Sequence, residues 1–220
     1  MLPTLTLTSP VQDSDEETLT RNQAARLLGL SPNTVSKLLA SRFLPDLQIW
    51  KVLALSRHPQ VTVACGVLPV LRTGPAAHVT RAEDEAPVLQ GDGVGLNDEQ
   101  FLDANRMWWR CDPEAVTEAG LLPVAVAGFV TGVLAIRGIE ESRRFAPGEV
   151  RHAFTATVAG RVGVLHDPAT YRVLGSDSQT AQLTAQLLGS RVTAAVSGGP
   201  IAYLVAEVNR EPIYGPPSGH

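Results

Sequence analysis

The sequence predicts an α+β protein, in which a short helical module precedes a mixed, mainly β domain. Three observations lead to this prediction. Helix-cap residues and helical apolar spacing concentrate within residues 18–58, and Val-rich segments punctuated by Gly and Pro follow from residue 61. Residues 82–97 are acidic and Gly-rich and lack apolar periodicity, which is typical of a linker. The 220 residues, 44 % of them hydrophobic, give room for two small domains.

Composition excludes several classes of protein. No apolar run approaches the roughly 20 residues of a membrane helix. The first ten residues contain neither a basic region nor a long apolar run, so we expect no secretory signal. Two cysteines, Cys65 and Cys111, are too few for a disulfide framework or a zinc site. We therefore expect a cytoplasmic, non-membrane chain with no cofactor and no metal.

Positive charge is concentrated in the first helical segment. The whole chain has a net charge of −4, but residues 18–58 hold six basic residues against the single acid Asp46. Arginine predominates over lysine, which together with the Ala, Val and Gly content suggests a GC-rich bacterial genome. Local positive charge is what a nucleic-acid-binding face requires, so the overall acidity does not argue against such a partner.

Two short helices with a tight turn are predicted within this basic segment. Thr20 is a good N-cap for a helix over Arg21–Leu28, which Gly29 ends. Ser31-Pro32 then starts a second helix that runs to Ala40. Small residues at the expected crossing and an apolar stripe between the helices complete a helix-turn-helix; they are Ala24, Ala25, Leu28, Leu30, Val35 and Leu38.

The segment TLTRNQAARLLGLSPNTVSKLLASRFLP resembles the helix-turn-helix of the excisionase/MerR-like DNA-binding family. The resemblance implies a recognition helix over Ser31–Ala40, with Arg42 near the DNA backbone. That family commonly continues into a basic β-wing, whereas residues 46–55 here predict a third helix. A wing would therefore have to come from Val61–Arg81.

We predict that this module contacts double-stranded DNA. Phosphate contacts are expected from Arg21, Arg42, Lys51 and Arg57, and base-edge contacts from Asn33, Ser36 and Lys37, with Ser31 and Thr34 on the same face. The competing interpretation is a helical packing element that binds no nucleic acid.

The remaining chain predicts a mixed domain that dimerises, recruits a partner or binds a ligand. The expected helices start at Asp98, Pro113 and Ser178, and Leu121–Ile136 predicts a hairpin that turns at Ala127-Gly128. The predicted organisation is a flexible acidic arm at 1–17, a helix-turn-helix domain with a possible wing at 18–81, a linker at 82–97, the mixed domain at 98–211 and a disordered tail at 212–220. Further strands are expected at Val61–Arg72, Ala76–Arg81, Ala153–Leu165 and Arg191–Val208.

Spaced aromatic and glycine motifs in this second half resemble PUA-like β-barrel domains. The motifs are Trp108-Trp109, Arg143-Arg144-Phe145 and Gly198-Gly199-Pro200. The resemblance implies a cleft that holds a nucleobase against Trp108 or Trp109. Adjacent tryptophans more often place one ring in the core and the other at a half-buried edge or interface.

The sequence gives little support for catalysis, and we expect no enzyme. The histidines lack metal-helix spacing, and Asp92, Asp98, Glu99 and Asp103 fall in a predicted loop and a solvated helix start. Cys65 is expected in the core of an apolar strand.

These features together predict a bacterial, nucleoid-associated DNA-binding protein. A transcriptional regulator or a phage- or plasmid-type accessory factor is expected, acting as a homodimer on paired half-sites. Three alternatives remain open: a sequence-nonspecific DNA-repair or DNA-organising protein, a nucleic-acid-processing enzyme, and a modified-base reader.

Overall fold

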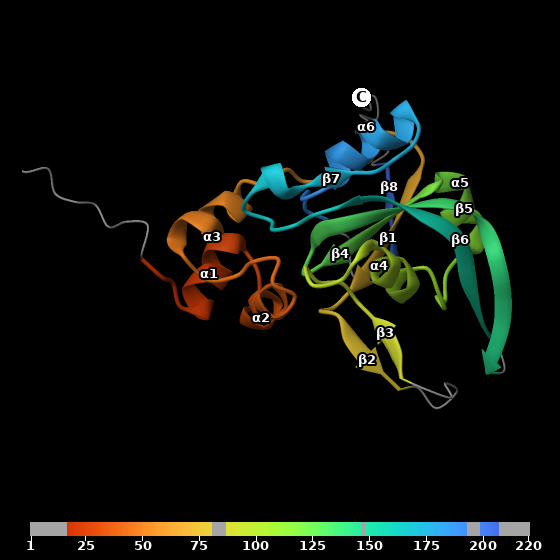
Figure 1. The fold of residues 1–220 in the computed structure, drawn as a ribbon, viewed down its shortest axis with the longest axis horizontal. Helices are drawn as coiled ribbons and strands as arrows, with labels where there is room; N and C mark the ends of the chain where they lie inside the picture. Colours follow the sequence, from red (N-terminus) through yellow and green to blue (C-terminus); the bar gives the residue numbers. More distant parts are fainter. Residues whose placement is uncertain (1–16, 81–86, 147, 193–198, 207–220) are drawn as a thin grey trace, which may run out of the picture.

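A computed structural model describes residues 17–80, 87–146, 148–192 and 199–206. These residues form a mixed α and β protein, as predicted, with a helical module at one end and a curled sheet at the other (Figure 1). The predicted arm at 1–17, apart from Glu17, and the predicted tail at 212–220 lie outside the described residues. Among the helices that the structure describes, none has the length and hydrophobicity needed to span a bilayer.

The helical module consists of α1 (Arg21–Leu28), α2 (Pro32–Ala40) and α3 (Ile49–Ser56). Thr20 caps α1 in a capping box with Gln23, and Gly29 ends it in the left-handed conformation with φ 64°. The Ser31 side chain caps α2. The helix boundaries predicted from these cap residues are confirmed, and so is the third helix.

One six-stranded sheet is the centre of the rest of the molecule. Its strands are β1 (Val67–Thr73), β4 (Leu121–Val126), β5 (Phe129–Ala146), β6 (Glu149–Arg161), β7 (Arg172–Val173) and β8 (Ile201–Val205). The order is β7-β6-β5-β4-β1-β8, with β1 and β4 parallel and the other neighbours antiparallel. The hairpin predicted over Leu121–Ile136 is confirmed, and it turns at Ala127 and Gly128, both with positive φ.

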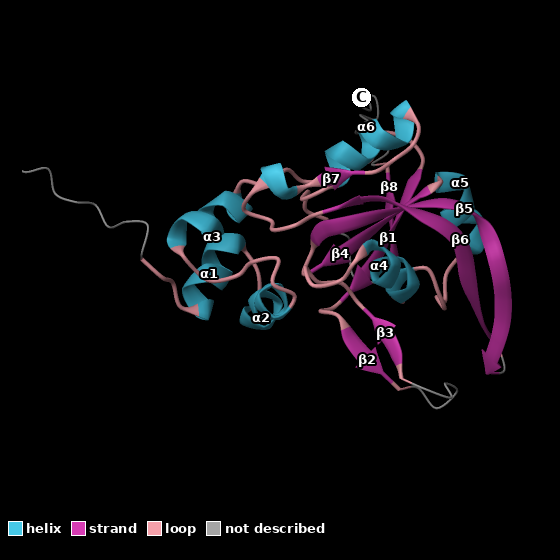
Figure 2. Ribbon diagram, in the orientation of Figure 1, coloured by secondary structure: helices cyan, strands magenta, loops and turns pink. Residues whose placement is uncertain are grey.

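Three more helices and a small hairpin surround the sheet. They are α4 (Asp98–Asn105), α5 (Pro113–Ala119), α6 (Ser178–Leu187), and the antiparallel pair β2 (Ala77–Val79) and β3 (Val88–Gln90). The predicted helix starts at Asp98, Pro113 and Ser178 are confirmed. Figure 2 shows β5 and β6 continuing past the body of the sheet as a long two-stranded arm.

Two hydrophobic clusters hold these parts together. One joins the buried residues of α1–α3 to a sheet face through side chains that include Phe129, Val130 and Leu165. The other packs α4 and α5 on the opposite face, with Phe101 and Phe154 completely buried. Backbone bonds reinforce the first junction, because the Leu165 amide donates to the Phe43 carbonyl at 2.9 Å. The helical module is therefore packed against the sheet.

Residues 87–97, the described part of the segment predicted as a linker, are folded against the rest of the chain. β3 pairs with β2 there, and Asp92 is completely buried. The amide of Val94 donates to the Ser41 carbonyl at 3.0 Å, just after α2. A buried ion pair with Arg161, distant in the sequence, holds this segment in place, and the local composition gives no sign of it.

Two strand predictions also need correction. The strand expected at Val61–Arg72 starts only at Val67, because Gly66 turns the chain with φ 79°. Cys65 therefore lies exposed in the preceding loop and not in the core. Of the strands expected at Arg191–Val208, only β8 and the single bridges of Arg191 fall within described residues.

The Val-rich strands are covered within the chain. β4 is buried at all six positions, between β1 and β5. The strands of the hairpin over Leu121–Ile136 are therefore covered by neighbouring strands of the same chain. Among the described residues, the two edges of the sheet, β7 and β8, do not pair with each other.

Candidate nucleic-acid interface

The exposed face of α2 carries the two side chains best suited to read DNA. Asn33 and Lys37 are exposed and lie four residues apart, on the same side of the helix. Val35 and Leu38, on the opposite side, are completely buried. Packing thus fixes the rotation of α2 and leaves an amide and an ammonium group facing solvent.

Ser36 is tied to the neighbouring helix. Its hydroxyl donates to the Pro32 carbonyl at 3.1 Å and accepts from Nη1 of Arg21 at 3.3 Å. Arg21 is exposed at the start of α1, so this bond brings a cation to the edge of the α2 face. Of the predicted base-reading set, Asn33 and Lys37 are the side chains that face solvent, whereas the Ser36 hydroxyl is engaged with Pro32 and Arg21.

The hydroxyls of Ser31 and Thr34 are engaged in the start of α2. Ser31 Oγ accepts from the Thr34 amide at 3.1 Å and lies 2.9 Å from Thr34 Oγ1. The sequence places both residues on the predicted face, but their main role in the structure is to cap the helix.

Arg42 lies in an unusual backbone conformation directly after α2. Its φ is 63°, in the left-handed region that glycine and asparagine tolerate best, and its side chain is exposed. Glycine would adopt this backbone conformation at lower cost than arginine does. Arg57 is likewise exposed, at the end of α3.

The Lys51 ammonium group, predicted to contact a DNA phosphate, is instead paired within the chain. Its Nζ is 2.5 Å from Oδ2 of Asp46 and 5.3 Å from the centre of the Trp50 ring. The side chain is only 12 % exposed. The predicted phosphate contact from Lys51 would require breaking this ion pair.

A cleft of about 600 Å³ lies between α2 and the carboxyl ends of β1 and β4. Lys37 lines it from α2 and Arg72 from β1, and no carboxylate is among the described residues that line it. Other lining residues are Thr34, Thr73, Gly74, Gln90, Trp109, Ala125, Ala127, Gly128, Val192 and Pro200. Arg72 and Gln90 were not among the predicted site residues, since only the packing of the helical module against the sheet brings them near Lys37.

The two tryptophans diverge, as expected for adjacent rings at a helix-to-strand junction. Trp109 is 5 % exposed, lines this cleft, and donates from Nε1 to the Asn105 carbonyl at 2.8 Å. Trp108 is half-buried under the β5–β6 arm, with the Arg143 guanidinium 4.3 Å and the Phe145 ring 6.0 Å from its own ring centre. Trp109 is the ring that lies in the core, and it offers the cleft almost no aromatic surface for base stacking.

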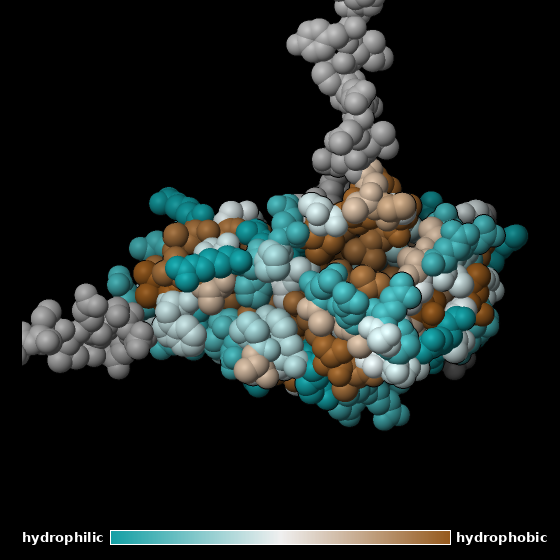
Figure 3. Space-filling model, turned by 90° about the horizontal axis from the view of Figure 1, so that it is seen from above, coloured by the Kyte–Doolittle hydropathy of each residue, from teal (hydrophilic) through white to brown (hydrophobic). Residues whose placement is uncertain are grey.

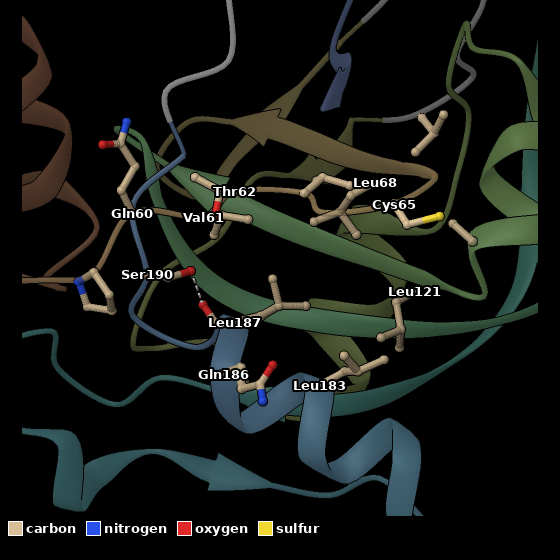
Figure 4. A pocket seen from close by; sticks show the side chains of 14 residues that line it. Gln60, Val61, Thr62, Cys65, Leu68, Leu121, Leu183, Gln186, Leu187 and Ser190 are labelled. Carbon is tan, nitrogen blue, oxygen red and sulfur yellow. Dashed lines mark hydrogen bonds between the residues drawn. The ribbon is translucent and has the colours of Figure 1, made fainter. Parts of the chain in front are cut away.

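A second cavity, of about 380 Å³, lies between residues 59–68 and α6 (Figure 4). Its lining is mainly apolar, with Leu121 and Leu183 facing it and Cys65 near one end. Seen from the side of α6, hydrophobic side chains gather on this face of the molecule (Figure 3). Arg191 connects the cavity wall to the module, because its amide donates to the Pro59 carbonyl at 2.7 Å and its Nη2 to the Leu28 carbonyl at 2.9 Å.

The described part of the chain brings no three His, Cys, Asp or Glu residues together in a way that would hold a metal ion. Asp92 and Asp98, predicted to be solvated, are both paired with Arg161, at 2.9 and 3.8 Å. The comparisons with known proteins give no match: no family model, no curated protein and no solved structure is significantly similar to this chain.

Proposed function

We propose that this chain binds double-stranded DNA by placing α2 in the major groove. The observation that carries the proposal is the exposure of Asn33 and Lys37 on one side of a capped, rigidly packed helix, with Arg21 and Arg42 on its flanks. Asparagine pairs bidentately with adenine, and lysine reaches guanine or phosphate. Arg21, Arg42 and Arg57 supply the phosphate contacts that orient the module.

The wing predicted at Val61–Arg81 is not formed by that segment alone, because β1 belongs to the large sheet. The β2–β3 hairpin, of which only β2 lies in the predicted segment, is the candidate wing in this proposal. It lies beside the carboxyl end of α2 (Figure 1), and a narrow groove lined by Arg42, Ala76 and Gly93 separates the two. In this proposal the hairpin follows the DNA backbone next to the recognition helix. The resemblance to excisionase/MerR-like modules supports the same arrangement.

The proposal includes a homodimer that pairs through β8. This strand ends the large sheet, and among the described residues its outer edge has no strand partner. Val205, on β8, is 62 % exposed. Unpaired strand edges favour pairing with another chain, and a symmetric dimer would let two small modules bind paired half-sites. The proposed role of such specific binding is transcriptional regulation at the nucleoid.

Binding without sequence preference, as in a DNA-organising protein, is the second candidate. The observation that favours it is the set of exposed arginines proposed to contact phosphates, Arg21, Arg42 and Arg57. They outnumber the two side chains proposed to read bases, Asn33 and Lys37. Phosphate contacts alone give affinity that is independent of sequence.

Fluorescence anisotropy with labelled genomic duplexes tests the proposal on the full-length chain. We expect affinity to fall steeply with salt, with a log–log slope of about −0.9 for each phosphate contact. Lys37→Gln and Arg42→Gln should weaken binding, whereas Arg144→Gln, an equal charge change on the distant β5–β6 arm, should not. A footprint on selected fragments would favour the regulator over the DNA-organising protein. Absence of binding at low salt would overturn both.

A further inference from the structure

The apolar cavity between residues 59–68 and α6 has the size of a small-molecule site. Its volume of about 380 Å³ falls within the range of about 300–1,000 Å³ that is usual for ligand pockets. Besides residues 59–68, Ala119 at the end of α5, Leu121 of β4 and Leu183 of α6 line it. Parts of the chain that are distant in the sequence thus enclose one space.

The lining of the cavity selects a neutral molecule. Among the described residues that line it, none carries a charged side chain. A charge without a partner is costly to bury against such walls. The cavity therefore suits an uncharged, mainly apolar ligand and disfavours its anionic or cationic analogues.

Polar and apolar side chains are separated along the cavity. Gln186 and Ser190 lie toward one end, and Leu68, Leu121 and Cys65 lie toward the other (Figure 4). Such a distribution matches a ligand that has an apolar body and a polar group at one end.

Ser190 gives the polar end a fixed hydrogen-bonding group. This residue is only 2 % exposed, and its Oγ donates to the Leu187 carbonyl. A hydroxyl oxygen that donates one hydrogen bond can still accept another. The side-chain amide of Gln186 can donate or accept beside it. The polar end can thus hold one hydrogen-bonding group of a ligand.

Two large apolar side chains of the lining are exposed to solvent. Val67 is 44 % exposed and Leu183 is 41 % exposed. A molecule seated against them would remove apolar surface from water, which favours its binding.

We propose that this cavity binds a neutral, mainly apolar small molecule, with its single hydrogen-bonding group against Gln186 and Ser190. The site does not depend on the proposed DNA binding. Leu121 and Leu187 also belong to the hydrophobic cluster that packs the helical module on the sheet. A molecule bound there to the folded chain raises its thermal stability.

Fluorescence titration of the full-length chain with two related probes tests the proposal. N-phenyl-1-naphthylamine is neutral, and 1-anilinonaphthalene-8-sulfonate has the same aromatic skeleton with an added sulfonate. We expect the neutral probe to bind about tenfold or more tightly than the sulfonate, because the lining offers the anion no cation. No binding of the neutral probe, or equal binding of the two, would overturn the proposal.

A charge on the cavity wall should weaken binding of the neutral probe. We expect Leu183→Glu to weaken it about tenfold or more. The matched control is Leu174→Glu, the same change at a leucine that is 42 % exposed and lies outside the lining. Thermal unfolding checks that both variants are folded. Affinity that Leu183→Glu leaves unaltered, or that both variants lower equally, would place the probe elsewhere and overturn the site.

Protection of Cys65 gives a second measurement, which needs no variant of the cavity wall. Cys65 lines the cavity and is exposed, whereas burial raises the pKa of the Cys111 thiol to about 12. N-ethylmaleimide should therefore modify Cys65 at neutral pH, and Cys65→Ser checks this assignment. Saturating N-phenyl-1-naphthylamine should slow the modification severalfold. Modification at an unchanged rate, with the probe bound, would overturn the assignment of the probe to this cavity.

Discussion

Arg161 on β6 donates from Nη2 to Oδ1 of Asp92 at 2.9 Å, and both side chains are almost completely buried. The other oxygen of Asp92 accepts from Thr131 Oγ1 at 2.7 Å, and the amide of Gly93 donates to Oδ1 at 2.8 Å. The guanidinium also stacks on Phe101, 4.1 Å from its ring centre. This pair fixes the segment that supports the end of α2, so it connects the sheet to the candidate interface.

Removal of Arg161 should be strongly destabilising. Arg161→Met leaves a buried carboxylate without its cation, which costs about 3–5 kcal/mol of unfolding free energy. The double variant Arg161→Met/Asp92→Asn should regain part of this loss, because no charge is then left unpaired. Urea unfolding of the four chains in this double-mutant cycle measures the coupling energy. Additive effects would show that the pair does not act as a unit.

Stability should depend on pH through Asp92. Burial raises the pKa of this carboxyl from 3.8 to about 6, against the opposing effect of Arg161. Since the folded-state pKa is the higher one, the folded chain binds the extra proton between about pH 4 and 6. The contribution of Asp92 to the free energy of unfolding therefore falls as the pH rises through this window, and stays constant above it.

The comparison of wild type with Asp92→Asn checks this pH dependence. Urea unfolding at pH 4, 5, 6 and 7 should show the wild type losing stability relative to the variant as the pH rises. Asp103→Asn, on the exposed side of α4, serves as the control and should change stability by less than about 1 kcal/mol at every pH. Parallel curves for wild type and Asp92→Asn would contradict the prediction.

Arg42→Gly should separate folding from binding. Glycine relieves the left-handed backbone at φ 63° and should raise the unfolding free energy by about 0.5–1 kcal/mol. The same change removes a phosphate contact and should weaken DNA binding for all sequences alike. Thermal unfolding and anisotropy measure the two effects, with Arg42→Lys as the charge-preserving control. A variant that loses stability would show that Arg42 packs in a way that the folded chain needs.

Asn33→Ala and Lys37→Ala should relax sequence preference more than they reduce nonspecific affinity. Each lost bidentate base contact should cost about 1–3 kcal/mol of discrimination. Competition between a selected site and random duplex measures this discrimination. Asn22→Ala, an equal change on the exposed side of α1, is the control. If Asn33→Ala left the footprint and the specificity unchanged, α2 would not be the recognition helix.

Val205→Lys should dissociate the proposed dimer. The side chain is exposed on the outermost strand, so a charge there disfavours edge pairing without disturbing the core. Light scattering of the full-length chain at tens of micromolar should give a dimer for wild type and for Val173→Lys at the opposite edge, and a monomer for Val205→Lys. A monomeric wild type would remove β8 from this role.

Local features of the fold follow from the sequence because they depend on contacts between near neighbours. Thr20 and Gly29 delimit α1 through bonds within one helical turn, and Ser31 starts α2 in the same way. The turn between β4 and β5 is equally local, since Ala127 and Gly128 adopt it within two residues. The conformation of such residues depends on their immediate neighbours, so it can be predicted without knowledge of the tertiary structure.

The sequence by itself determined the helical module, its basic character and the exposed positions of Asn33 and Lys37. Only the tertiary structure decided that Asp92 is buried against Arg161, that Lys51 is paired with Asp46, and that Cys65 is exposed. The cleft belongs to the same group, because Lys37, Arg72 and Trp109 are far apart in the chain and line one cleft only when the helical module packs against the sheet. Burial and pairing of a charge depend on which distant surface covers it, and a pattern of neighbouring residues does not contain that information.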